Sequence, residues 1–559
     1  MTTLPTINMR FNLNTNWKRI MLSAFCALPL ALWAQKDTSR KPSVDIISSY
    51  KPVLRNVAKI NLSGSQLQAD TSRQVRMYQV PSQNLIYAYS PVSLKPLALE
   101  QDTNLYLGNR NYVKAGFGSY STPYLKAGLG FGDGKKMLVN LYGLYTSSKG
   151  SIKNQDYSEL TVRGTGSYFM PSNEVYADVS MQQKTFHLFG YDHSLFDYKK
   201  SEVRQAFQEL NLKVGFRNTK SLPMSFSYDP TIQFNVFNLR DKLTETSVML
   251  SLPLQARIND QFSVRASFDG DFTNYSTSSL PANVKFSNNV LKLSPGIKYE
   301  SPRLNIHAGL TPSWDNGIFN MLPNIYAEAQ LQEKVFMLQA GWVGNIIKNT
   351  FRNMSAVNPY LAVIGGQRNT RELELYGGIK ASVGKHFNMS AKASLLSYTN
   401  LPLFINDTSS LANNKQFLVS NESKINNFRI HADMSFISQD KFSITAGVNL
   451  NAFTNMVDNA KAWNTLPLEL TGSFRWWAFK RMLLKSDLYL FGGGKYLDFG
   501  NLSRNFSGGT DLSIGAEYKV NQQFSAFLDV NNLFANKYQR WHNYEVYGLN
   551  LLGGIVVRF

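Results

Sequence analysis

The chain has 559 residues, a formal net charge of +20, 13% aromatic residues and only 17% charged residues. Its one cysteine, Cys26, lies near the N-terminus, so the rest of the chain can form neither a disulfide nor a thiolate metal site. Basic residues alternate with aromatic residues at strand period and carry no recognisable RNA- or DNA-binding signature, which argues against a nucleic-acid partner.

Residues 1–34 have the three regions of a secretory signal peptide. Three basic residues precede an apolar run over 20–32, and we expect cleavage after Ala34. The run is too short to span a bilayer as a helix, and no later segment has about 18 consecutive apolar residues. A lipoprotein would instead use Cys26, but the bulky Phe25 precedes it where a small residue is expected. Cleavage removes three positive and no negative charges and leaves +17, which suits anionic solutes, anionic lipids or loops that face a membrane surface.

Residues 35–105 differ in composition from the chain that follows. Five prolines separate short apolar pieces there: Pro42, Pro52, Pro81, Pro91 and Pro96. Prolines at this density disfavour helices and regular strands, so the segment is expected to be extended and docked against or inside something larger. It is not an obvious independent domain.

From about residue 111 the sequence alternates with period two, strand after strand. After the turn at 132–134, for example, Met137, Val139, Leu141 and Tyr145 fall on one face of the next strand. Further tight turns are predicted at 171–173, 259–260, 301–302, 332–333, 384–385, 439–440 and 521–523. Each joins two strands tightly.

Between these hairpins the connections are longer and richer in polar and aromatic residues. They are predicted at about 186–204, 276–285, 349–370, 399–423, 454–463, 495–509 and 533–544. Alternation of tight turns with long loops is expected when the turns are periplasmic and the loops extracellular. The pattern predicts an all-β fold, a transmembrane antiparallel β-barrel of about 22 strands over 106–559, uncertain by about two strands. Closing the sheet also removes the edges that invite aggregation.

The final fifteen residues, 545–559, are predicted to be the closing strand of this barrel. Counting back from Phe559, every second residue forms one largely apolar face: Val557, Ile555, Gly553, Leu551, Leu549 and Tyr547. This face matches the ~9–11 residues of a tilted strand that crosses lipid. A C-terminal aromatic residue on such a face resembles the signal read by bacterial barrel-assembly machinery. We therefore predict that Phe559, Val557, Ile555 and Leu551 form this signal, with the machinery and outer-membrane lipids as partners.

The candidate sites for other chemistry are weak. Gly128, Gly130, Gly132 and Gly134 alternate through a strand, whereas a phosphate-binding loop needs a strand before the glycines and a helix after them. These glycines are instead expected to let a neighbouring backbone or aromatic side chain approach closely.

The six histidines are scattered over separate segments. His187 and His193 share one predicted loop with Tyr191, Asp192 and Asp197, which permits a weak metal or ligand site, although a solvated loop is the simpler interpretation. We find no G-x-S-x-G motif and no local Ser/His/acid signature, so neither an enzyme nor a cofactor is predicted.

Four aromatic residues lie near predicted strand ends. Trp476 and Trp477 are near a periplasmic turn, and Trp541 and Tyr544 are near the outer end of the last strand. Aromatic girdles occupy these two levels in outer-membrane barrels. Each residue is therefore predicted to face the membrane interface.

Residues 527–538 (FLDVNNLFANKY) resemble the V-x-N-L-F-x-x-x-Y element in the penultimate strand of TonB-dependent outer-membrane receptors. The matching positions are Val530, Asn532, Leu533, Phe534 and Tyr538. The hairpin at 374–395, preceded by Asn358-Pro359-Tyr360, is similar to a later part of the same barrels. Overall, residues 373–559 resemble Bacteroidota-type receptor-like barrels, which implies the outer membrane of a Gram-negative bacterium.

The chain departs from this family in its N-terminal part. Such receptors carry a plug of roughly 130–150 residues, and only about 70 are available here between the signal peptide and the barrel. The tetrapeptide at 44–47 (VDII) is hydrophobic and near the mature N-terminus, as a TonB box would be, but any exposed strand-like tetrapeptide would look the same.

Three interpretations of function follow from this resemblance. The barrel could be a channel or transporter for hydrophilic solutes, open or partly filled by residues 35–105, or an energised receptor with a degenerate plug and a TonB-type partner. Alternatively, it could be a scaffold that does not transport, assembled with lipoproteins or with an assembly or secretion complex. A polar lumen favours transport, and an occluded lumen with co-purifying envelope proteins favours a scaffold.

Overall fold

The structure is a computed structural model that describes residues 111–559 except 221, 241, 278–283, 333–335, 364, 367, 385, 410–412, 439–440 and 499–501. All described residues belong to one compact unit, which lies within Val80–Phe559. The predictions for the signal peptide, the Pro-rich segment 35–105 and the tetrapeptide at 44–47 concern residues outside this description.

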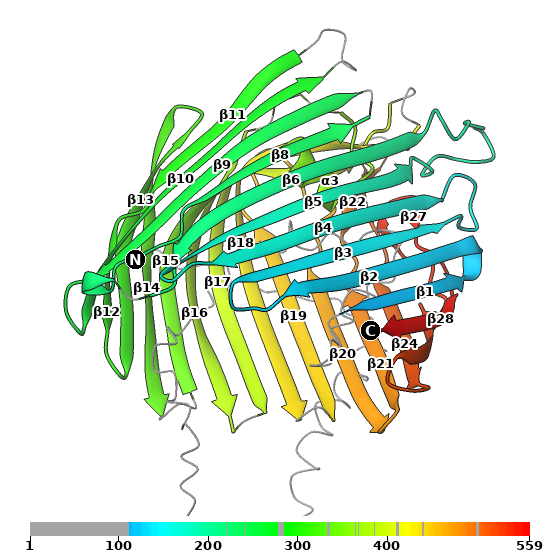
Figure 1. The fold of residues 1–559 in the computed structure, drawn as a ribbon. Helices are drawn as coiled ribbons and strands as arrows, with labels where there is room; N and C mark the ends of the chain where they lie inside the picture. The colour runs from blue at the N-terminus through cyan, green and yellow to red at the C-terminus, as the bar shows by residue number, and fades with distance from the viewer. Residues whose placement is uncertain are drawn as a thin grey trace, which may run out of the picture. The chain divides into compact units, whose positions relative to one another are not determined.

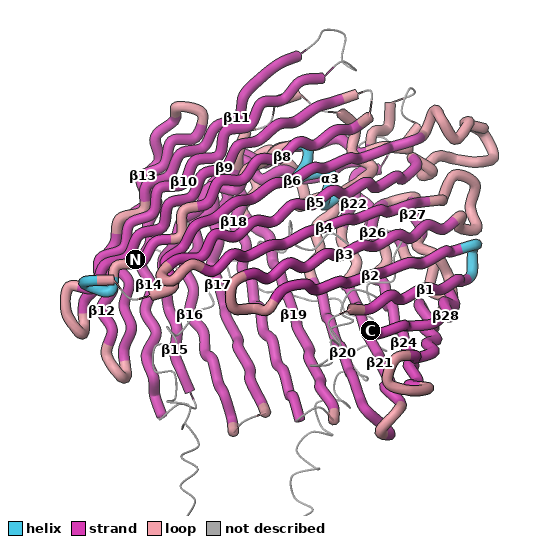
Figure 2. Tube along the Cα trace, viewed as in Figure 1, coloured by secondary structure: helices cyan, strands magenta, loops and turns pink. Residues whose placement is uncertain are grey.

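Twenty-four strands form one continuous antiparallel sheet (Figures 1 and 2). They are β1 (Tyr112–Gly118), β2 (Thr122–Gly132), β3 (Met137–Ser148), β4 (Tyr157–Phe169), β5 (Asn173–His187), β6 (Arg204–Asn218), β7 (Ser227–Tyr228), β8 (Thr231–Leu239), β9 (Leu243–Arg257), β10 (Phe262–Thr277), β11 (Val284–Leu293), β12 (Gly296–Glu300), β13 (Leu304–Asp315), β14 (Ile318–Gln332), β15 (Phe336–Ile347), β16 (Thr370–Val383), β17 (Phe387–Asn406), β18 (Phe417–Ser438), β19 (Phe442–Thr454), β20 (Leu468–Phe479), β21 (Met482–Phe491), β24 (Gly509–Lys519), β25 (Phe524–Asn531) and β28 (Asn550–Arg558).

The remaining described elements lie in the connections between these strands. They are the hairpin strands β22 (Lys495–Asp498) and β23 (Leu502–Asn505), the pair β26 (Gln539–Trp541) and β27 (Tyr544–Glu545), the helix α3 (Phe351–Val357) and the short 3-10 turns at Ser119–Ser121 and Pro223–Ser225.

The sheet closes into a barrel because β1 pairs antiparallel with both β2 and β28, the last strand. Two crossings of the wall are interrupted next to Pro230 and Pro295, which lack the N–H that a strand interior must donate. Thus β7 and β8 both pair with β9, and β11 and β12 both pair with β10. The barrel therefore has 22 crossings, as the sequence predicted.

Large apolar side chains alternate along the strands and face outward. Met137, Leu141 and Tyr145, which were predicted to share a face of β3, are 47%, 44% and 41% exposed. Exposed apolar side chains recur on this face from β1 to β28, far more than a soluble protein leaves in water. A closed barrel with such a surface spans an outer membrane. Among the described residues, no helix is long and apolar enough to cross a membrane.

The strand order fixes which connections share an end of the barrel. The predicted tight turns at 132–134, 171–173, 259–260, 301–302 and 521–523 are all at the end where β28 finishes, which is the periplasmic end. The longer connections lie at the opposite, extracellular end, as expected. The turn at 439–440, residue 333 of the predicted turn 332–333, residue 385 of the predicted turn 384–385 and residues 278–283 of the predicted loop 276–285 lie outside the described residues.

One predicted loop was wrong. Most of 399–423 belongs to β17 and β18, which pair from Phe387 to Asn406 against Phe417 to Phe436. Leu401 and Leu403 are buried against Trp463 of the following loop, so the hairpin gains apolar contacts beyond the level where its neighbours end. Its prolines and polar residues resemble loop composition, and these distant contacts are not visible in the sequence.

One glycine within a strand and one turn illustrate the local rules. At Gly128, an added Cβ would lie 2.4 Å from the ring of Tyr112, so this glycine admits an aromatic side chain, as predicted for the glycine-rich strand. Asn316 and Gly317 both have positive φ and join β13 to β14 in a two-residue turn. The Asn-Gly signal for this hairpin is present in the sequence, although the prediction of turns missed it.

Candidate functional site

Four extracellular loops meet at the mouth of the barrel, and we call their described residues the loop cap. They are 188–203, 348–369, 407–416 and 532–549, which follow β5, β15, β17 and β25. These positions are distributed around the ring, so contacts among the four loops bridge the mouth. The wall itself has lipid on one side and lumen on the other, and the largest cluster of buried apolar side chains therefore lies where these loops meet the upper strands.

Tyr360 and Tyr544 form the centre of the loop cap. Their rings stack with centroids 3.4 Å apart, and Phe189 meets Tyr544 edge-on at 4.8 Å. The three side chains come from three different loops and are at most 2% exposed. The Tyr544 hydroxyl donates a 2.5 Å hydrogen bond to the carbonyl oxygen of Lys415 in a fourth loop. Burial raises the pKa of Tyr544 well above its usual range, so this phenol stays protonated.

Trp541 lies in the same core and corrects a prediction. Its ring packs edge-on against Phe404 and Phe417, each with a centroid separation of 5.4 Å. Because Trp541 and Tyr544 are at most 1% exposed, neither belongs to the aromatic girdle predicted for them. Trp476 is 42% exposed near the periplasmic end, as the girdle prediction requires, and Trp477 lies under the ammonium of Lys519 at 4.3 Å.

Helix α3 attaches the cap to the inner wall through charged groups. Arg352 donates from its backbone N–H to Glu245 of β9 at 3.2 Å and from its guanidinium to Glu209 of β6 at 3.2 Å. Lys348, just before the helix, forms an ion pair with Asp271 of β10. Glu245 is fully buried, so it depends on the charge of Arg352. We call these contacts the latch.

Asparagine side chains fix the two ends of the α3 loop. Asn349 donates to the carbonyl oxygen of Arg368 at 2.7 Å and to the Thr370 hydroxyl at 2.9 Å. Asn369 accepts from the Asn349 backbone N–H at 3.0 Å and exchanges hydrogen bonds with Asn288 of β11. The loop therefore leaves and rejoins the wall at fixed positions.

Below the cap, charged and polar side chains continue along the inner wall. Lys392 pairs with Glu374 at 2.8 Å, and Ser394 donates to the same carboxylate at 2.6 Å. On the next strand Arg429 donates to the Tyr398 hydroxyl at 2.7 Å. Both signs of charge are present, so this wall can form hydrogen bonds with anionic and cationic groups of a passing solute.

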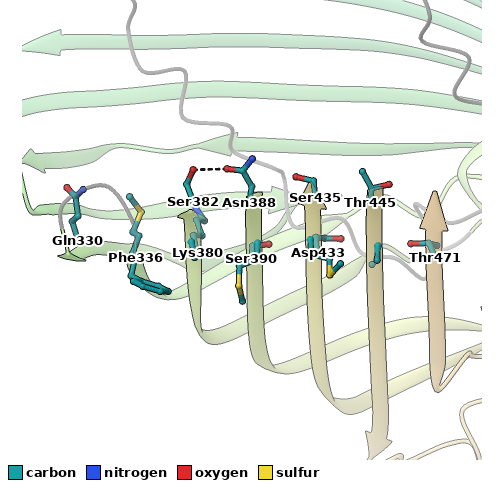
Figure 3. A pocket seen from close by; sticks show the side chains of 16 residues that line it. Gln330, Phe336, Lys380, Ser382, Asn388, Ser390, Asp433, Ser435, Thr445 and Thr471 are labelled. Carbon is teal, nitrogen blue, oxygen red and sulfur yellow. Dashed lines mark hydrogen bonds between the residues drawn. The ribbon is translucent and has the colours of Figure 1, made fainter. Parts of the chain in front are cut away.

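Nearer the periplasmic end, side chains of β14 to β20 line a cavity of about 560 Å³, with polar groups such as Ser390 and Thr471 beside apolar ones such as Phe336 (Figure 3). Ser382 donates to the Asn388 side chain at 2.8 Å, and Lys380 pairs with Glu328 at 2.6 Å. Asp433 is on the neighbouring strand and forms an ion pair with His431. The polar inner face thus extends from the latch to the lower part of the wall.

The receptor-like motif lies where β25 ends and the chain turns into the loop cap. Asn532, with positive φ and 1% exposure, donates 2.7 Å hydrogen bonds to the carbonyl oxygens of Asn536 and Tyr547. The Tyr538 hydroxyl donates to Asp511 at 3.2 Å. The other members, Val530, Leu533 and Phe534, lie at or just beyond the end of β25, the last two exposed. Asn532 and Tyr538 thus hold the turn that positions Trp541 and Tyr544.

The predicted assembly-signal residues lie on β28 and at its end. Leu551, Ile555 and Phe559 are 46%, 54% and 60% exposed on the outward face, and Val557 shares that face. Tyr547 does not belong to it, because β28 begins only at Asn550 and Tyr547 is buried in the cap. The role of this face in assembly remains a prediction.

The predicted histidine cluster does not form a common site. His187 contacts Asp156, whereas His193 contacts the carbonyl oxygen of Phe189 at 3.0 Å. Asp192 accepts hydrogen bonds from Ser194, and Asp197 pairs with Lys153. Within the described part of the chain, no group of three or more potential ligands is placed to hold a metal ion.

Comparison with solved structures finds the same fold at low sequence identity. The FrpB iron transporter of Neisseria meningitidis matches with a TM-score of 0.62 and 9% identity, over 83% of this chain and 82% of that chain. The siderophore receptor PirA of Acinetobacter baumannii matches with a TM-score of 0.61 and 11% identity, over 80% of both chains. A mutant ferric enterobactin receptor PfeA of Pseudomonas aeruginosa gives 0.59 and 12%, also over 80% of both chains.

No protein-family model and no curated protein sequence matches this chain. The structural matches therefore establish the fold: a 22-stranded barrel of the kind that these outer-membrane receptors and transporters have. The resemblance found in the sequence is confirmed at this level.

Proposed function

We propose that the protein is a gated outer-membrane transporter for a hydrophilic solute, in which the loop cap controls entry from outside. The observation that carries the proposal is the pairing of a bridged mouth with a polar inner wall. Tyr360 and Tyr544 join loops from distant parts of the ring, while charged side chains continue below them. A passive pore needs an unobstructed mouth, whereas gated uptake needs one that opens.

The latch suggests how the cap could respond to a solute. A cavity of about 260 Å³ lies beside α3 and is lined by Lys184, Glu209, Arg352 and aromatic side chains of the upper strands. A solute with charged groups that entered it would compete with the wall for Arg352. The cap would then lose a connection to the wall at the moment of binding.

The partners and the cargo are part of this proposal. The neighbours are named as an iron transporter, a siderophore receptor and a ferric enterobactin receptor. A ferric chelate is therefore the first cargo to test, and a TonB-type energy-coupling protein the first partner. The barrel-assembly machinery would insert the chain through the outward face of β28.

A scaffold for envelope proteins is the second candidate, because the same bridged mouth would also suit a barrel that never opens. It predicts stable co-purification of lipoproteins or other envelope proteins from gently solubilised membranes. It also predicts no solute-dependent change in the cap.

The test is conductance in planar bilayers for four forms of the mature protein: intact, lacking 36–105, with 351–360 replaced by a flexible linker, and with both changes. Gated transport predicts little steady conductance from the intact form. It predicts large conductance when 351–360 is replaced by the linker, alone or together with the N-terminal deletion. Heat-modifiable mobility on gels controls for a folded barrel. If all four folded forms stay closed, transport through the lumen is wrong. Large steady conductance from the intact form would instead show an open channel.

A further inference from the structure

An outward-facing groove on β15 to β18 is not explained by transport. Its volume is about 380 Å³, and one cross-strand row supplies its large side chains: Trp342, Leu375, Leu395 and Phe428. These four side chains are between 45% and 58% exposed. They face away from the lumen, because the residues next to them on the same strands face inward. Glu374 pairs with Lys392, and Arg429 donates to the Tyr398 hydroxyl, on the inner wall.

The groove has space on its periplasmic side. The next outward row in that direction has small residues on three strands, Ala340, Gly377 and Ala393, and Ile430 on β18. A Cβ placed on Gly377 would meet no heavy atom within 4 Å. A narrow apolar molecule could therefore continue from the groove down the wall toward the membrane centre.

On its extracellular side the groove becomes polar and then basic. The next row contains Ser397, Asn426 and Thr454 beside Leu373 of β16. The row beyond it contains Arg371, Thr399 and Lys424 beside Ile346 of β15. Below Arg371, the outward positions of β16 from Leu373 to Val383 are apolar or small over eleven residues, the length that crosses a hydrocarbon layer. Arg371 and Lys424 are therefore at the level of lipid headgroups.

The two cations are available to a ligand. Arg371 donates a hydrogen bond to the Thr399 hydroxyl at 3.2 Å, and both Arg371 and Lys424 are exposed. Within the residues that the structure describes, neither forms a salt bridge. Asp458, a carboxylate on the adjacent loop, accepts instead from the backbone N–H of Ser423 at 2.7 Å and from its hydroxyl.

We propose that this surface binds a single phosphorylated lipid of the outer leaflet. An acyl chain lies over Leu375 and Leu395, between Trp342 and Phe428. Hydroxyl, amide or ester groups meet Ser397 and Asn426, and a phosphate group lies between Arg371 and Lys424. The order apolar, polar, basic along the membrane normal matches the order of acyl chain, linkage and phosphate in such a lipid. A partner protein would need no such gradient. The inference stands whether or not the barrel transports a solute.

The experiment measures lipid retained by the full-length mature protein, purified in mild detergent, by native mass spectrometry. The probes are diphosphorylated lipid A, its dephosphorylated form and inorganic phosphate. Wild-type protein is expected to hold one diphosphorylated molecule, to hold the dephosphorylated form at least tenfold more weakly, and to release neither when inorganic phosphate is added.

Two variants and one control separate the parts of the site. R371Q/K424Q should weaken binding of the diphosphorylated lipid at least tenfold and leave the dephosphorylated form unaffected. Gly377→Leu, which adds bulk in open space below the groove, should weaken both forms. Lys285→Gln removes another exposed cation on β11, away from the groove, and should change nothing. Equal binding by wild type and R371Q/K424Q, equal loss in Lys285→Gln, displacement by inorganic phosphate, or a protein bound at this face in place of lipid would each overturn the proposal.

Discussion

Tyr360 and Tyr544 stack with their ring centroids 3.4 Å apart, although they belong to loops that leave the wall after β15 and β25. The contact ties together parts of the ring that share no strand pairing. It makes the extracellular end a packed core rather than a set of independent loops.

Replacing Tyr544 by alanine should open this core. Its ring contacts Tyr360, Phe189 and Phe417, and truncation of a buried aromatic side chain typically costs about 3–5 kcal/mol. We expect external protease to cleave the loop 532–549 in Tyr544→Ala on intact cells. Tyr145→Ala, which removes a half-exposed tyrosine from the outer face of the wall, is the matched control. Equal protease resistance of both variants would contradict the packing described here.

Loss of the latch should release α3 without unfolding the barrel. Arg352→Gln leaves Glu245 buried without its cation, at a cost of about 3–5 kcal/mol by analogy with other broken buried pairs. Hydrogen exchange should rise in 351–357 and remain slow in the wall. Adding Glu245→Gln removes the stranded charge and should restore part of the protection. Exchange in the double variant that is as fast as in Arg352→Gln alone would show that Arg352 does not act through Glu245.

The contact between the β22–β23 hairpin and the loop 532–549 should weaken in acid. His542 stacks on Tyr496 with centroids 4.0 Å apart, and burial lowers the pKa of His542. The folded form thus disfavours the protonated ring, so this contact is complete above the unfolded pKa of about 6.5 and is lost as the pH falls below that value through the lowered pKa of the folded form. Hydrogen exchange of 495–505 at pH 7.5 and pH 5 measures the effect. His542→Phe keeps a stacked ring and should abolish the pH dependence.

Removing the terminal aromatic side chain should slow barrel assembly. Phe559 is 60% exposed on the outward face and makes few packing contacts that the folded barrel could lose. We therefore expect Phe559→Ala to lower the amount of heat-modifiable barrel in the membrane, while barrel that does form has unchanged thermal stability. Phe524→Ala, on the neighbouring strand at the same end, is the control. Equal loss in both variants would indicate a general packing effect.

The wall could be predicted from sequence because the alternation of apolar and polar residues that marks each strand is a local pattern. Met137, Leu141 and Tyr145 need only alternate to face lipid, and closing the ring follows from the number of such strands. For the same reason the prediction of 22 crossings was correct even where individual boundaries were displaced. The Asn316-Gly317 turn carried an equally local signal.

The loop cap could not be predicted because its contacts are distant. Trp541 and Tyr544 lie near a strand end, where an aromatic residue suits either an interfacial girdle or a buried core. Only their distant partners decide between the two: Phe404 and Phe417 for Trp541, and Tyr360 for Tyr544. The hairpin of β17 and β18 was predicted wrongly for the same reason. Its composition resembles a loop, and burial of Leu401 and Leu403 against Trp463 makes it a strand pair.

The largest cluster of buried apolar side chains lies in the loop cap, and this location affects the order in which the protein folds. Neighbouring wall strands can pair as soon as both are made, but Tyr547 donates to the Gln155 carbonyl oxygen across 392 residues of sequence. Contacts of such separation carry a high loop-closure cost until the strands between them are in place. The cap should therefore condense last, after β1 meets β28, and burial of Trp541 becomes a spectroscopic report that the ring has closed.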